Sequence, residues 1–296
     1  MTIQRIFLAL CAVLLIQASG KAAMIEVDAP ESVLTGTAFV IGITTDSPEQ
    51  VKVEWQKVWV MLTPEIVQNT PVRYFGRVLL PVSINADTGT AKLVCSLFEA
   101  GAGAGAKPFV RDITITANTF ETQELTVEGR YVNPPQSVQA RIEKERARSR
   151  EALSLKTPEQ LWSLPFTRPV PGVVTSSFGL RRVFNKEPRA PHMGLDLRGA
   201  EGTPIAACAA GMVVLAEEQY YAGNCVYINH GMGVISSYMH MSALNVKEGQ
   251  TVARGERIGS VGATGRVTGP HLHLGVSILG TPVDPLPLLE SLSKSR

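Results

Sequence analysis

The chain has 296 residues, enough for two domains, and 45% hydrophobic with 18% charged residues is the composition of a folded protein. The net charge of only +2, spread along the chain, excludes the strongly basic surface that nucleic-acid binding needs, so we expect no nucleic-acid partner. Four cysteines are too few for a fold held by disulfides. The histidines are unevenly placed, because all five lie between His192 and His273.

Residues 1–23 have the features of a secretory signal peptide. Arg5 precedes an unbroken apolar run from Ile6 to Ile16, and small residues follow it. This run is shorter than the roughly 20 residues that a membrane-spanning helix needs, and no later segment is apolar enough to span a membrane. We therefore expect export to the periplasm, cell envelope or exterior, with no stable membrane span after cleavage.

Residues 24–130 show the period-two alternation of short β-strands. Val51, Val53 and Trp55 alternate with polar residues, and residues 91–97 repeat this pattern after a turn at Asn85–Gly89. Several short strands at this spacing predict a small β-sandwich of immunoglobulin-like type. Since this segment carries no cluster of catalytic or metal-ligating residues, we expect a spacer, a targeting module or a cover over the following domain.

Residues 131–164 are expected to form a linker with a charged helix. Ser137–Ser154 contains neither Gly nor Pro, and opposite charges recur three or four residues apart. We expect Ser137 to be the N-cap. Val138 and Ile142 form only a narrow apolar stripe, which indicates a solvated connecting helix, and the interleaved glutamates disfavour a basic binding surface.

Residues 165–290 are rich in glycines that separate short apolar segments, such as Cys225–Asn229 and Val234–Met239. This pattern predicts a compact antiparallel β domain with little helix. Residues 291–296 are then a short tail. For the whole chain, we expect a predominantly all-β fold.

Three short motifs hold four of the five histidines: His192–Asp196, Tyr238–Met241 and Gly269–His273. Imidazole nitrogen and carboxylate oxygen are the ligands that catalytic zinc takes in proteins. Because residues two apart on a strand point to the same face, one histidine of the last motif could bind a metal while the other takes a proton from the water that the metal activates. His240, on a separate strand, could face the developing oxyanion.

Residues 166–289 resemble the lysostaphin-type (LytM-like) zinc metallopeptidases, which cleave peptide bonds of bacterial peptidoglycan. The matching stretches occur in the order of the family: Ser177–Arg181, His192–Asp196, Gly202–Pro204, Gly211–Val213, Asn229–Gly231, Tyr238–Met241 and Thr268–His273.

The resemblance implies that His192, Asp196 and His273 bind one zinc ion per chain. It also implies that His271 is the general base and that His240 stabilises the tetrahedral intermediate, although these two histidines could exchange or share their roles. The implied function is an exported zinc endopeptidase that hydrolyses peptidoglycan cross-links, with stem peptides as partners. The alternative is a catalytically silent scaffold that binds peptidoglycan or activates an amidase; it is disfavoured because all five positions are kept.

Other residues of the C-terminal segment are assigned structural roles. His230 follows an expected strand, and Arg181 is expected to form an ion pair near the mouth of the site. Cys208 and Cys225 fall on expected neighbouring strands, so a disulfide between them stays open. The sequence does not reveal which cross-link is cut, or the oligomeric state.

Overall fold

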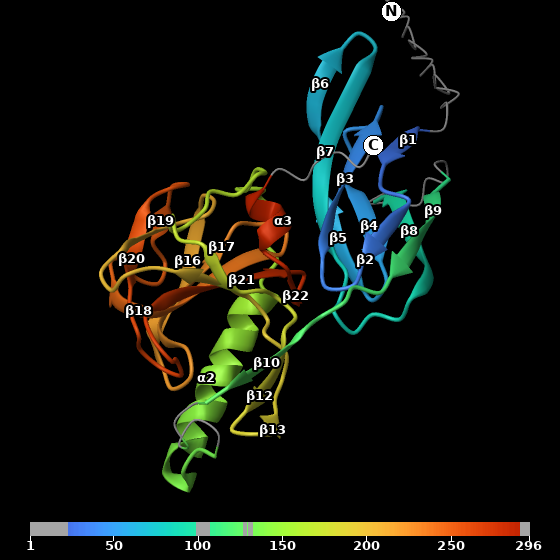
Figure 1. The fold of residues 1–296 in the computed structure, drawn as a ribbon. Coiled ribbons are helices and arrows are strands. Elements are labelled where there is room, and N and C mark those ends of the chain that lie inside the picture. Colours follow the sequence, from blue (N-terminus) through green and yellow to red (C-terminus); the bar gives the residue numbers. More distant parts are fainter. Residues whose placement is uncertain (1–22, 99–106, 127–128, 130–132, 291–296) are drawn as a thin grey trace, which may run out of the picture.

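The structure is a computed structural model that describes residues 23–98, 107–126, 129 and 133–290. Figure 1 shows two strand-rich units side by side, with helix α2 (Gln136–Ser154) packed on the C-terminal one. The expectation of a predominantly β fold is confirmed. The expected signal peptide, except Ala23, and the expected tail lie outside the described residues.

The N-terminal unit consists of two sheets that pack face to face. Alternation in β4 buries Val51, Val53 and Trp55 completely. The Trp55 ring meets Phe39 of the opposite sheet edge-on at 5.1 Å, and its indole N–H donates to the Pro81 carbonyl at 2.8 Å. The first sheet has the order β1 (Ile25–Asp28), β3 (Ala38–Thr45), β7 (Val72–Pro81), β6 (Glu65–Asn69); the second has the order β2 (Ser32–Leu34), β9 (Phe109–Thr116), β8 (Gly89–Leu97), β4 (Val51–Trp55), β5 (Val58–Leu62).

The C-terminal unit is built on one large antiparallel sheet, as the glycine-punctuated pattern predicts. Its strand order is β11 (Val174–Ser176), β14 (Leu195–Arg198), β21 (His271–Ile278), β18 (Val234–Leu244), β17 (Gly223–Asn229), β16 (Gly211–Gln219) and β19 (Thr251–Val252). β20 (Arg257–Val261) pairs with β18 and with β15 (Pro204–Ala206), and β22 (Thr281–Val283) pairs with β21. The short helix α3 (Leu286–Leu289) follows.

A strand from the connecting segment joins the C-terminal unit. β10 (Thr122–Leu125) pairs in parallel with β12 (Arg181–Phe184), which in turn pairs with β13 (Glu187–Pro188). The segment that leaves the sandwich therefore adds an edge strand beside Arg181–Phe184.

Helix α2 differs from the expectation in two respects. It begins directly after Pro135 without a side-chain cap, so Ser137 lies in the first turn and its expected role as N-cap is wrong. A proline is well tolerated there because the first helical N–H groups lack intrahelical partners anyway. Nor is the helix solvated all round: Ile142 and Ala152 are buried, and Arg148 forms ion pairs with Glu217 and Glu248 of the C-terminal unit.

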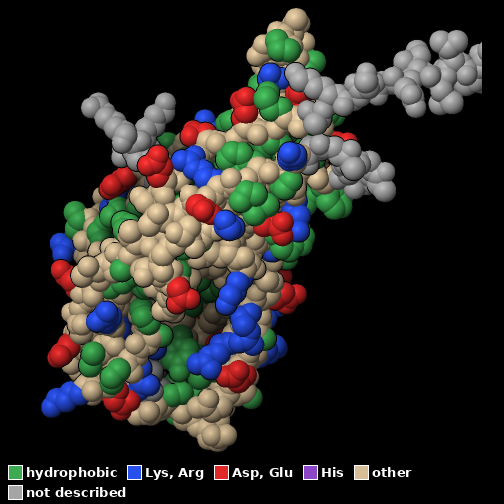
Figure 2. Space-filling model, turned by 90° about the vertical axis from the view of Figure 1, so that its right-hand side faces the viewer, with side chains coloured by type: hydrophobic (Ala, Val, Ile, Leu, Met, Phe, Trp, Pro, Cys, Tyr) green, Lys and Arg blue, Asp and Glu red, His purple; other side chains and the backbone are tan. Residues whose placement is uncertain are grey.

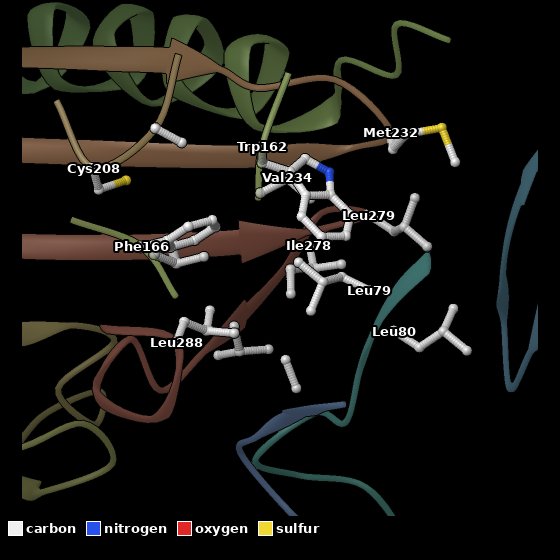
Figure 3. Packing of buried hydrophobic residues seen from close by; sticks show 14 of the residues in the cluster. Leu79, Leu80, Trp162, Phe166, Cys208, Met232, Val234, Ile278, Leu279 and Leu288 are labelled. Carbon is white, nitrogen blue, oxygen red and sulfur yellow. The ribbon is translucent and has the colours of Figure 1, made fainter. Parts of the chain in front are cut away.

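An apolar interface joins the two units. Leu79 and Leu80 of β7 lie beside Ile278 and Leu279, and one hydrophobic core runs through both units (Figure 3). Ile278 ends β21, whereas His271 begins it, so seven residues at about 3.3 Å each place this interface roughly 23 Å along the strand from that histidine. The N-terminal unit therefore docks at the end of β21 that lies away from the histidines.

The cysteines of the described residues are unpaired. Cys208 belongs to the main core, whereas Cys225 belongs to a separate cluster that includes Ala152 of α2. The open possibility of a Cys208–Cys225 disulfide is therefore not realised. Within the described part of the chain, neither helix is long and apolar enough to cross a membrane.

Candidate functional site

Sheet pairing brings the three histidine motifs to one place. In the antiparallel pair β14–β21, Asp196 lies opposite His273, and on the other side of β21 His273 lies opposite Met239 of β18. His240 follows Met239, and His192 enters from the loop before β14. Segments about 80 residues apart in sequence thus meet at the start of β21.

Three ligand-type atoms form a nearly equilateral triangle. His192 Nε2 lies 3.0 Å from His273 Nδ1 and 2.9 Å from Asp196 Oδ1, and His273 Nδ1 lies 2.9 Å from the same oxygen. The side chains of His192 and Asp196 are buried. Ligands at about 2.0–2.1 Å from a tetrahedral ion are separated by roughly 3.3 Å, so the triangle has nearly the size that zinc requires.

The protonation of these rings also fits a cation. His192 Nδ1 lies 2.8 Å from the carbonyl oxygen of Ser177, which can only accept, so Nδ1 carries the proton and Nε2 presents a lone pair. In the neutral ring, His192 Nε2 therefore faces Asp196 Oδ1 and His273 Nδ1 without a proton of its own. These three atoms share at most one proton, that of His273. A bound cation would remove the resulting repulsion, and a hydrogen-bonded second ring nitrogen is usual for a metal-binding histidine.

The second oxygen of Asp196 is held by an arginine. Arg182 donates to Asp196 Oδ2 at 3.1 Å, and both side chains are largely buried. Arg181 is exposed, so the ion pair expected for it is made by its neighbour instead. Sequence reasoning missed Arg182.

His240 reaches the site through an unusual backbone conformation. Its φ of +66° is in the left-handed region, and the pairing of β18 with β17 shifts register between Tyr238 and Met241. As a result His240 lines the same cavity as the preceding Met239, whereas alternation along a regular strand would turn it to the opposite face. Strain of this kind collects at functional sites.

His240 and His271 present equivalent nitrogens. His240 Nδ1 donates to the Thr264 carbonyl at 2.9 Å and His271 Nδ1 to the Gly269 carbonyl at 2.8 Å, which leaves both Nε2 atoms as acceptors. The ring centroids are 5.0 Å apart, and His271 Nε2 lies 3.8 Å from Asp196 Oδ1. Burial, together with the neighbouring histidines, lowers the pKa of His240 to about 3, so this ring is a weak base.

A cavity of about 630 Å³ opens beside these residues. His192, His240 and His273 line it on one side, and α2 supplies a wall on the other. No side chain within residues 23–98 or 107–126 lines it. The α2 residues of the wall are Ile142, Glu145, Arg146, Ser149, Arg150 and Leu153.

His230 lies in the core rather than at the site. Its Nδ1 donates to the Ala210 carbonyl and its Nε2 contacts Ser236 Oγ, both at 2.7 Å. Burial lowers its pKa to about 4. This fully satisfied, inaccessible ring has the structural role expected for it.

Comparison with known proteins finds a family match over a segment that contains these histidines. Residues 190–285 match peptidase family M23. The chain is similar to the peptidoglycan DD-endopeptidase ShyA of Vibrio cholerae, with 43% identity over 128 residues that cover 42% of this chain and 30% of that protein. It is also similar to the DD-carboxypeptidase/endopeptidase Mpg of Neisseria meningitidis, with 42% identity over 113 residues, 38% of this chain and 26% of that protein.

Among solved structures, the chain is similar to a putative peptidase M23 from Pseudomonas aeruginosa, with a TM-score of 0.63 and 28% identity. That alignment covers 86% of this chain and 94% of the other, so it includes strands of both units. The curated relatives are longer proteins, and the aligned part of this chain spans less than a third of their length.

Proposed function

We propose that this chain is an exported zinc-dependent endopeptidase that hydrolyses peptide cross-links of bacterial peptidoglycan, and the match of residues 190–285 to peptidase family M23 supports this. The observation that carries the proposal is the triangle of His192 Nε2, Asp196 Oδ1 and His273 Nδ1. Two further histidines, His240 and His271, lie beside it, each with Nδ1 engaged by a carbonyl and Nε2 left as an acceptor.

We assign His192, Asp196 and His273 as the ligands of one zinc ion. When bound there, zinc would polarise the scissile carbonyl and lower the pKa of water for attack. Arg182 donates to Asp196 Oδ2 and so orients the carboxylate with Oδ1 toward the two imidazoles. The hydrogen bond from His192 Nδ1 to Ser177 fixes the tautomer that leaves Nε2 free to bind.

We assign proton transfer to His271. Its Nδ1–H is engaged by Gly269, so Nε2 can take a proton from the attacking water and pass it to the leaving amine. His240 is the weaker base because burial lowers its pKa, which supports the role that the sequence gives it, the stabilisation of negative charge on the carbonyl oxygen. That role requires His240 to carry its single proton on Nε2 instead of Nδ1, at the cost of the hydrogen bond to the Thr264 carbonyl.

The relatives support the substrate class. ShyA is named as a peptidoglycan DD-endopeptidase, and Mpg is named as a DD-carboxypeptidase/endopeptidase. Peptidoglycan lies outside the cytoplasmic membrane, which agrees with the signal peptide expected in residues 1–23. Export is therefore part of the same proposal.

The test is hydrolysis of purified peptidoglycan sacculi by the mature chain, with and without a chelator. We expect peptide fragments whose masses identify the cleaved bond, loss of activity with chelator and recovery with zinc. His192→Ala and His273→Ala should lose both zinc and activity, whereas Asp112→Asn, which changes an exposed carboxylate on β9, should lose neither. A chain that binds sacculi and zinc but releases no fragments would instead be the silent scaffold.

A further inference from the structure

The cavity beside the site is lined by five arginines and a single carboxylate. The arginines are Arg146, Arg150, Arg182, Arg189 and Arg266, and the carboxylate is Glu145. Figure 2 shows Lys and Arg side chains close together along one side of a hollow on one face of the molecule. This charge distribution contrasts with the nearly neutral chain as a whole.

Most of these charges are neutralised within the protein. Arg182 pairs with Asp196, Arg189 with Glu187, and Arg146 with Glu143. Glu145 accepts hydrogen bonds from Arg141 and from the Tyr220 backbone N–H. The presence of Arg146, Arg182 and Arg189 in the cavity is therefore weak evidence for a bound ligand.

Arg266 is different. Its guanidinium lies over the Tyr221 ring at 4.8 Å and over the Phe184 ring at 5.0 Å, and its backbone N–H donates to the Tyr221 carbonyl. The two rings come from the loop between β16 and β17 and from β12, so they hold the side chain from two directions. Among the described residues, no carboxylate lies within ion-pair distance of it.

The surroundings of Arg266 disfavour its charge. Burial lowers its pKa, and the nearby positive charges of Arg182 and Arg189 lower it further. Stacking on the two rings favours the charged form but places no anion beside it. A half-buried guanidinium that is oriented, faces a cavity and lacks a counter-ion is a preorganised site for an anion.

We propose that Arg266 binds a free carboxylate of the peptide substrate and so makes the enzyme selective for peptides that carry one near the scissile bond. The planar guanidinium fits a carboxylate with two parallel hydrogen bonds. Arg150 of α2, which also lines the cavity, adds positive charge from the opposite wall. The identity of the peptide as a peptidoglycan stem peptide rests on the proposed function, whereas selectivity for a carboxylate does not.

The experiment compares two cross-linked peptidoglycan peptides, one with free carboxylates and one with the same groups amidated. We expect the zinc-loaded wild type to have about tenfold lower KM for the free acid, the effect of one charge-assisted hydrogen bond in a partly buried site. Arg266→Gln should raise KM for the free acid about tenfold, leave kcat nearly unchanged and remove the preference. Arg266→Lys should keep part of it, because the charge remains without the planar fork.

The matched control is Arg77→Gln, since Arg77 also stacks on an aromatic ring, that of Phe75, but lies on β7 of the N-terminal unit. Zinc content and melting temperature of every variant report whether the fold is intact. Direct binding of both peptides to chelator-treated protein separates the two proposals. Carboxylate-selective binding that Arg266→Gln abolishes, without any hydrolysis, would support this inference and reject the proposed function. Hydrolysis of both peptides with equal KM would support the proposed function and reject this inference. An Arg266→Gln variant that keeps wild-type binding and selectivity would also overturn the inference.

Discussion

Replacing Gly194 by alanine should weaken zinc binding without unfolding the protein. Gly194 lies between His192 and Asp196, and a Cβ atom at this position would lie 2.5 Å from His273 Nε2 and 2.6 Å from its Cε1. It would also lie 2.7 Å from the Leu274 carbonyl oxygen, a backbone atom that cannot turn aside. The ring of His273 must therefore move, and the backbone around Gly194 and Leu274 must shift as well.

The size of the effect follows from these distances. An ordinary contact begins at about 3.4 Å, so the His273 ring must shift by roughly 0.9 Å. Metal–ligand distances tolerate only about 0.2 Å, which means that Nδ1 leaves its position in the ligand triangle. We expect zinc to bind at least 100-fold more weakly, about 2.7 kcal/mol, and overpacking to lower the free energy of unfolding of the metal-free protein by about 1–3 kcal/mol.

Competition with a chromophoric chelator measures the zinc affinity, and urea denaturation measures stability. Gly269→Ala is the matched control, because a Cβ atom there meets nothing within 4 Å and the backbone is not left-handed. Gly269 is also only two residues from a histidine of the site. Wild-type zinc affinity in Gly194→Ala would refute the assignment of His273 Nδ1 as a ligand, and an equal loss in Gly269→Ala would refute the steric explanation.

Three further predictions concern charged and titrating groups. The free thiols should not react with a thiol reagent in the native protein, since burial raises the pKa of Cys95 and of Cys225 to about 12; a disulfide would instead leave two thiols unreactive after denaturation. The NMR signals of His230 should not titrate above about pH 5. The pKa of His230 is about 4 in the folded protein, below its value in the unfolded chain. Its contribution to the free energy of unfolding, roughly 3 kcal/mol, is therefore present above pH 6.5 and lost as the pH falls through 4. An NMR titration midpoint near pH 6.5 would contradict this. Arg182→Met should destabilise the metal-free protein by about 3 kcal/mol but the zinc-loaded protein by less, because zinc compensates the buried charge of Asp196; equal losses in urea denaturation would argue against it.

The sequence predicted the parts of the site that follow from regular strand geometry. His271 and His273 share a face because they are two apart on a strand, and antiparallel pairing brings Asp196 opposite His273. Arg182 was missed because nothing in the pair Arg181–Arg182 distinguishes the inward residue from the outward one. The registration of β12 between β10 and β13 decides this, and it depends on contacts distant in the sequence.

His240 shows a second limit of sequence reasoning. The motif marks it as functional, but the regular alternation assumed for its strand would place it with Tyr238, whose hydroxyl is in the core near Cys208. Only the left-handed φ and the register shift against β17 place it on the same side as Met239. A single residue in a sparsely populated conformation has no sequence pattern of its own, particularly where glycine is absent.

The arrangement of the units changes which part of the chain could control access to the site. The hypothesis that the β-sandwich covers the groove assumed that the unit ahead of the peptidase domain lies over it, yet the sandwich packs at the far end of β21, against Ile278 and Leu279. The wall beside the histidines is α2. Its exposed ion pairs, such as that of Arg148 with Glu248, contribute at most about 1 kcal/mol each, so the buried contacts of Ile142 and the other apolar α2 residues chiefly hold the helix in place. Removing all residues before Pro165 would thus take away both the sandwich and this wall and uncover the core at Ile278. Substitutions on the cavity side of α2, rather than truncation, are the way to ask what limits entry of the substrate.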